Sequence, residues 1–115
     1  MGYVPPFSSH TQTADGVARI AVSGELDLAT APVLYDQIVS AEAPGVTDIT
    51  LDLQDMTFLD GSGLRALLAA RSRADANGHR LLLVGATAPA LRLFELTGTR
   101  YLLDEQDGDH HAVAP

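Results

Sequence analysis

The residues with the most distinctive chemical potential form one short segment, Asp60-Gly61-Ser62-Gly63-Leu64, between an expected strand and an expected helix. Asp60 fits a helix N-cap whose carboxylate accepts a hydrogen bond from the backbone N–H of Ser62 or Gly63. Free amides and the helix dipole at such a start favour an anion such as phosphate, and Ser62 is a candidate for modification. The same residues also fit a tight strand-to-helix turn with a structural role alone. The residues leave both interpretations open.

A dinucleotide site is a further hypothesis, because Gly61 to Ala66 match the pattern G-x-G-x-x-[GA]. Three observations argue against it. Residues 55–60 separate the glycines from the preceding strand, no acid follows the next strand at 84–86, and 115 residues leave no room for a second nucleotide-binding half. We therefore expect no cofactor, and a small nucleotide-binding domain or enzyme remains an alternative.

A second polar loop, Gly24-Glu25-Leu26-Asp27, also connects an expected strand to an expected helix. Glu25 and Asp27 could form a catalytic carboxylate pair, but a solvated loop with a helix-start charge explains them more simply. Loops at the carboxyl ends of parallel strands gather on one edge of the sheet, so we expect Asp27 and Ser62 to belong to one site. Ser62 lacks the G-x-S-x-G pattern of a nucleophile elbow, and we expect no enzymatic activity.

The histidines give no convincing metal site. His110 and His111 beside Asp109 could bind a metal, but adjacent histidines point in different directions in most conformations. His10 and His79 are isolated. The chain has no cysteine, which removes thiolate ligands and disulfides and agrees with a cytosolic location. We expect no bound metal.

Hydrophobic periodicity and turn residues predict the elements that must position these loops. Asp15-Gly16 signals a hairpin between the first two strands, and Thr30 and Thr87 each precede a helix start containing proline. Residues 55–58 are expected to be a link. The predicted strands are 9–14, 17–22, 48–53, 81–84 and 101–103, and the predicted helices start at 31, 61 and 88.

This order predicts an α/β fold with a mixed, mostly parallel sheet, an antiparallel N-terminal edge hairpin and helices packed on it. We expect one domain over residues 11–103, a flexible lead-in at 1–10 and an acidic flexible tail at 104–115. If the first strand is an exposed edge, weak dimers through it can form, so a monomer or weak dimer is expected.

Composition narrows the class of partner. The chain carries seven arginines, no lysine and fifteen acidic residues, for a net charge of −8. It lacks the basic surface expected of proteins that bind nucleic acid or anionic membranes. No apolar run is long enough to insert into a membrane, and the first residues do not resemble a signal peptide.

Taken together, three motifs in order resemble the STAS domain, and more narrowly the bacterial anti-sigma factor antagonists. The resemblance covers Thr11 to Leu103. The motifs are VSGELD at 22–27 followed by Ala31-Pro32, LDL at 51–53 followed by FLDGSGL at 58–64, and RLFELTG at 92–98.

The resemblance implies a non-enzymatic regulator that works by partner switching. Such an antagonist binds an anti-sigma factor, typically a serine kinase of the histidine-kinase-like ATPase type, and so releases a sigma factor. The kinase then phosphorylates a serine at the start of the second helix, the antagonist dissociates, and a phosphatase could reverse the modification. The resemblance places the partner-binding site at Asp27, Asp60, Gly61, Ser62, Gly63 and Leu64.

One residue departs from the family pattern. The family usually has Asp-Ser-Ser-Gly-Leu or Asp-Ser-Thr-Gly-Leu, and the phosphorylated serine directly follows the aspartate. Here Gly61 occupies that position, and Ser62 matches the second hydroxyl residue. The chain is then an antagonist that the usual kinase cannot switch off, an antagonist phosphorylated on Ser62, or a STAS scaffold subunit of a sensory or lipid-transport complex.

Overall fold

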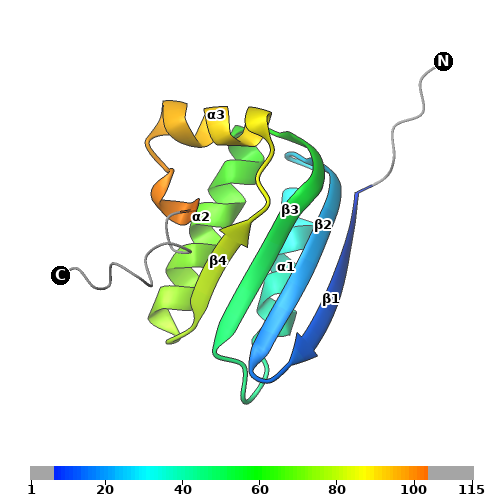
Figure 1. Cartoon of the computed structure of the whole chain (residues 1–115), viewed down its shortest axis with the longest axis vertical. Coiled ribbons are helices and arrows are strands. Elements are labelled where there is room, and N and C mark those ends of the chain that lie inside the picture. Colours follow the sequence, from blue (N-terminus) through cyan, green and yellow to red (C-terminus); the bar gives the residue numbers. More distant parts are fainter. Residues whose placement is uncertain (1–6, 104–115) are drawn as a thin grey trace.

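Four strands form one sheet in the order β1-β2-β3-β4, and the computed structural model describes residues 7–103 (Figure 1). β1 runs antiparallel to β2, whereas β2, β3 and β4 are parallel. The expected mixed sheet with an antiparallel edge hairpin is confirmed. The elements are β1 (Ser8–Ala14), β2 (Val17–Leu26), α1 (Ala31–Ala41), β3 (Asp48–Leu59), α2 (Gly61–Ala76), β4 (Arg80–Val84) and α3 (Ala88–Thr97).

The N-terminal hairpin turns at Asp15 and Gly16, which both have positive φ, at 52° and 82°. Two consecutive residues of this kind match the twist of the flanking strands in a two-residue hairpin loop. The turn therefore fixes the register in which Ala14 faces Val17 and Ser8 faces Ser23. β1 begins at Ser8, so the strand starts within the segment that was expected to be a lead-in.

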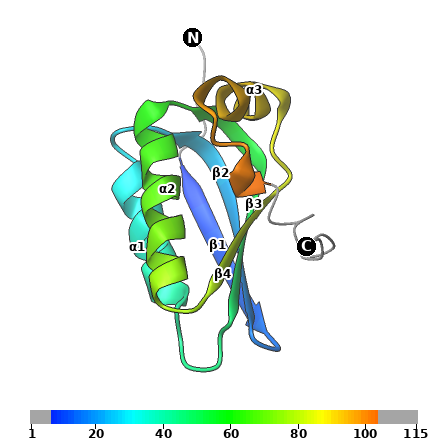
Figure 2. The same ribbon diagram turned by 90° about the vertical axis from the view of Figure 1, so that its left-hand side faces the viewer.

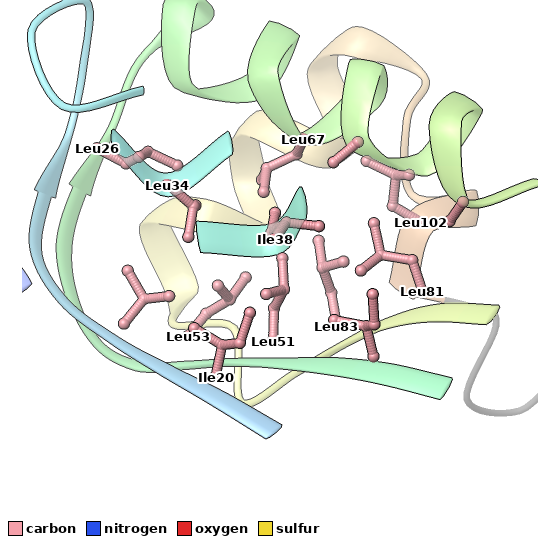
Figure 3. Packing of buried hydrophobic residues seen from close by; sticks show 14 of the residues in the cluster. Ile20, Leu26, Leu34, Ile38, Leu51, Leu53, Leu67, Leu81, Leu83 and Leu102 are labelled. Carbon is pink, nitrogen blue, oxygen red and sulfur yellow. The ribbon is translucent and has the colours of Figure 1, made fainter. Parts of the chain in front are cut away.

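One layer of apolar side chains holds the helices to the sheet (Figure 3). Along β2, every second residue from Ala18 is buried, which is the period of a strand with one covered face. The parallel register aligns Ile20 with Leu51 and Leu51 with Leu83, so these side chains form a continuous row. α1 and α2 cover this face, and α3 crosses the end of the sheet where the parallel strands terminate (Figure 2).

β3 differs from its expected length, because it continues through residues 55–58 to Leu59. The alternating pattern stops at Leu53, and the residues after it have no strand signal of their own. β2 extends to Leu26 and supplies hydrogen-bonding partners for this segment, with register shifts near Ser23 and Gly24. Pairing with a neighbouring strand thus decides the conformation of residues 55–58, and the expectation of a link was wrong.

The expected last strand at residues 101–103 is also wrong, because these residues are helical. The backbone N–H of Leu102 donates to Thr99 O at 3.0 Å, and that of Leu103 donates to Arg100 O at 2.8 Å. These bonds are local, so the segment does not join the sheet. Leu102 is fully buried in the core beside Leu81, which anchors the turn without strand pairing (Figure 3).

Candidate functional site

Two loops meet at the end of the sheet where β2 and β3 terminate and where α1 and α2 begin (Figure 1). Leu26 and Leu59, the last residues of the two strands, are partners in the parallel register. The backbone N–H of Asp60 then donates to Leu26 O at 3.3 Å. The structure thus brings the Asp27 loop (residues 27–30) and the start of α2, which contains Ser62, together on one edge, as the strand order predicts.

Asp27 shapes the first loop through its carboxylate. Its Oδ1 accepts hydrogen bonds from the backbone N–H groups of Ala29 at 3.0 Å and Thr30 at 3.1 Å. The Thr30 hydroxyl donates to Glu25 O at 2.7 Å and accepts from the Asp27 N–H at 3.0 Å. Thr30 is the N-cap residue of α1, but its hydroxyl makes no cap hydrogen bond because the loop uses it. The outcome is a fixed loop that exposes Leu28 over 76% of its surface.

Asp60 caps α2 as expected, since its Oδ1 accepts a hydrogen bond from Gly63 N at 2.9 Å. Gly63 allows the helix start to approach β2 closely. A Cβ on Gly63 would lie 2.5 Å from Leu26 O and 2.7 Å from Leu59 Cδ1, closer than side chains pack. A glycine is therefore needed at this position to seat the second loop against the first.

The expected site residues differ in how accessible they are. Gly61 is exposed, and a Cβ there would meet no atom within 4 Å. Ser62 is half-buried, whereas Gly63 and Leu64 are buried. Gly61 and Ser62 are therefore accessible to a partner. Gly63 and Leu64 are not, and they pack the start of α2 against the rest of the domain.

A groove of about 390 Å³ opens between α1 and α2 beside these loops. Its walls are mostly apolar, and Ser62 contributes to the wall formed by α2. Such concave apolar sites with a few polar groups are typical binding sites. The lining residues are Leu28, Ala31, Pro32, Tyr35, Asp36, Ser62, Arg65, Ala66 and Ala69.

Two exposed charges of opposite sign line this groove, Asp36 on α1 and Arg65 on α2. Neither forms an ion pair with another residue in the described part of the chain. Sequence reasoning found Ser62 but missed the other groove residues. The spacing of Pro32, Tyr35 and Asp36 on one helix flank was a usable signal, but only the packing of α1 against α2 shows that this flank lines a groove.

The described part of the chain holds no cluster of three or more metal-ligating side chains. The residues weighed above as metal ligands, Asp109, His110 and His111, lie outside residues 7–103. Over the same residues, no helix combines the length and the apolar character needed to cross a bilayer.

Comparison with known proteins identifies the family. The family model described as "Mlab, STAS domain" matches residues 9–104. An anti-sigma-B factor antagonist from Staphylococcus aureus is 30% identical over 98 residues, which cover 85% of this chain and 91% of the relative. The chain belongs to the STAS domain family.

Solved structures agree with this assignment. An anti-sigma factor antagonist from Mycobacterium paratuberculosis has a TM-score of 0.74 and 30% identity, over 85% of this chain and 83% of that one. The unphosphorylated form of the anti-sigma factor antagonist SpoIIAA has the same fold, with a TM-score of 0.70 and 19% identity over 96% of this chain and 98% of that one.

Proposed function

We propose that this chain is an anti-sigma factor antagonist that binds an anti-sigma factor through the Asp27 loop, the start of α2 and the groove between α1 and α2. The observation that carries the proposal is 30% identity over 98 residues with a relative of that name, along nearly the whole of both chains. The chain acts by binding rather than by catalysis. Its partner is a serine kinase of the histidine-kinase-like ATPase type.

The chemistry of the groove defines what the partner must supply. Its apolar walls favour an apolar side chain on the partner, because burying apolar surface is the main favourable term in such contacts. Arg65 favours an acidic residue of the partner on the α2 side, and Asp36 favours a basic residue on the α1 side. Leu28 extends the apolar surface from the groove to the neighbouring loop.

We further propose that phosphorylation does not switch this antagonist off in the usual way, because Gly61 has no hydroxyl. Ser62 is half-buried in the groove wall, so a bound partner covers it. A phosphate at Ser62 would add a charge of about −1.5 to −2 to a mostly apolar contact surface and oppose binding. The wild-type complex is therefore expected to persist in the presence of ATP.

A pull-down from the native host with tagged chain, ATP and Mg²⁺ tests the class of partner. We expect recovery of an ATPase of the histidine-kinase-like type. Recovery of transporter or sensory-complex subunits without such a kinase would support a scaffold role and overturn the proposed function.

Charge reversal tests the contact surface once the partner is purified. We expect Arg65→Glu to weaken binding about tenfold or more in isothermal titration calorimetry. Arg92→Glu is the matched control, because it makes the same charge change at an exposed position on α3 that does not line the groove. Equal losses for both variants would indicate a general effect of net charge and would remove the groove from the interface.

The missing acceptor is tested by Gly61→Ser. The position has room for the side chain, and its φ lies outside the left-handed region. With the purified kinase and ATP, we expect phosphoserine on residue 61 and release of the partner, whereas the wild-type chain stays bound. Phosphorylation of wild-type Ser62 with release would contradict the proposed loss of the switch while leaving the antagonist function intact.

A further inference from the structure

β1 is an edge strand without the features that normally prevent strands from pairing with other chains. It forms one border of the sheet, and its outer side carries no other described element (Figure 1). Its seven residues contain no lysine, arginine, acid or proline, and its register with β2 has no bulge. Edge strands are usually protected by these devices, by shortness or by a covering element. The opposite edge, β4, has five residues and begins with the charged Arg80.

An edge strand has backbone N–H and C=O groups that no neighbouring strand pairs with. In an antiparallel pair, alternate residues direct both their N–H and C=O groups toward the neighbouring strand. About half of the residues of β1 therefore bond to β2, and the others direct these groups away from the sheet. The outward row is a template for one more strand, and nearly every β1 side chain is exposed.

We propose that the occupant is a second copy of this chain, with β1 pairing antiparallel to β1 about a two-fold axis at Thr11. Thr11 is the central residue of Ser8–Ala14, so this register uses the whole strand. It places Thr11 opposite its own copy and Ser9 opposite Thr13, on the side of the sheet that carries the helices. Hydroxyl pairs of this kind stabilise antiparallel strands.

The β1 side chains on the other face of the sheet, away from the helices, also fit this register. The register places His10 opposite Gln12 and Ser8 opposite Ala14, so no like-charged pair of acids or of arginines forms across the seam. A closed dimer requires a surface that is complementary to itself, and this strand meets that condition in the register about Thr11. A partner of different sequence would need no such symmetry, which is why the structure favours a second copy.

The outer flank of α1 supports the same partner. α1 turns Leu34 and Ile38 toward the sheet, and its other flank lines the groove with α2. The remaining flank carries Val33, Gln37 and Ser40, spaced i, i+4, i+7, all exposed and uncharged. α1 contacts β1 and β2, whereas α2 contacts β3 and β4, so this flank lies on the β1 side of the molecule. This flank therefore places the exposed, apolar Val33 and no charged residue beside the proposed β1–β1 interface.

The dimer is expected to be weak and to tighten with salt. Pairing through one short strand buries less surface than the roughly 1,200 Å² of a stable interface. Each copy carries a net charge of −8, and salt screens the repulsion between two such copies. Analytical ultracentrifugation from about 10 µM to about 1 mM, a range that suits a weak complex, is expected to show a concentration-dependent monomer–dimer equilibrium. A monomer throughout this range at high salt would overturn the proposal.

Substitution of Thr11 tests the location of the seam. Thr11→Lys places two like charges directly opposite each other, and we expect the dissociation constant to rise about tenfold or more. Thr57→Lys is the matched control, because Thr57 is an exposed threonine on β3 away from the border strand. Unfolding curves verify that both variants are folded. An unchanged dimer in folded Thr11→Lys would contradict pairing through β1.

Cysteine cross-linking tests the register, and the absence of native cysteine makes it specific. Directly opposite residues have Cβ atoms about 4.5–5.5 Å apart, close to the separation that a disulfide needs. Under mild oxidation, Thr11→Cys is expected to form a covalent dimer at least tenfold faster than Thr57→Cys. Equal rates would refute the register. Binding of the anti-sigma factor is measured separately, so failure here leaves the proposed function intact.

Discussion

Replacing Gly63 with alanine tests whether the close contact between α2 and β2 builds the site. The added Cβ would lie 2.5 Å from Leu26 O, 2.7 Å from Leu59 Cδ1 and 2.9 Å from Leu26 Cγ. The carbonyl cannot turn away freely, because it accepts the hydrogen bond from Asp60 N at 3.3 Å. Relief therefore requires the start of α2 to move away from β2.

The expected loss of stability follows from this crowding. Overpacking a well-packed position typically costs about 1–3 kcal/mol. Gly61 provides an internal control two residues away, because a Cβ there meets no atom within 4 Å. Alanine is favoured over glycine in a helix by roughly 0.5–1 kcal/mol, so Gly61→Ala is expected to be neutral or stabilising. Because both changes replace glycine with alanine in the first turn of α2, this gain is common to them, and the two variants should differ by the crowding cost of about 1–3 kcal/mol.

Urea unfolding monitored by circular dichroism measures this difference. Thermal unfolding gives a second measure, because about 1 kcal/mol shifts the midpoint of a domain of this size by roughly 4–8 °C. We expect Gly63→Ala to unfold at lower urea and lower temperature than Gly61→Ala. If Gly63→Ala were as stable as the wild type, the close contact would not constrain the helix start, and our account of the site would be wrong.

Three further substitutions test individual contacts by the same unfolding assays. Asp60→Ala removes the cap of α2 and should cost about 1 kcal/mol, with Asp60→Asn largely restoring it; no loss would contradict the cap. Thr30→Val removes the hydroxyl that joins Glu25 O to Asp27 N and should cost about 1 kcal/mol; an unchanged stability would remove that bridge from the loop. Leu102→Ala should cost about 2–5 kcal/mol, because its side chain is fully buried; a loss below about 1 kcal/mol would mean that residues 101–103 do not anchor to the core.

The site divides into residues that build the surface and residues that a partner can reach. Asp27, Asp60 and Gly63 use their polar groups or their lack of a side chain to fix the two loops. Gly61 and Leu28 are exposed on that scaffold. Substitutions in the first group should lower stability and binding together, whereas those in the second should change binding without a loss of stability.

Most of the fold was predictable because the sequence carries strong local signals. The Asp15-Gly16 dipeptide signalled the hairpin, and the alternation of residues 48–53 and the stripe on α1 identified their covered faces. The cap of α2 by Asp60 was also local, since it depends on residues three positions apart. The common edge of the two loops followed from strand order alone.

Other features depend on contacts between segments far apart in the chain. Residues 55–58 are strand because β2 pairs with them, and residues 101–103 are helical because Leu102 reaches the core from a local turn. Local patterns contain no information about these partners.

The sequence by itself therefore determined the order of the elements from β1 to α3, the buried faces of most of them and the residues where β2 leads to α1 and β3 leads to α2, because hydrophobic period, caps and turns act over a few residues. Only the tertiary structure decided which of those residues are accessible, since burial depends on what packs against them. It also decided that α1 and α2 enclose a groove with Asp36 and Arg65 on its walls. The physical reason is that grooves and open borders are properties of neighbouring elements, and no single segment encodes its neighbour.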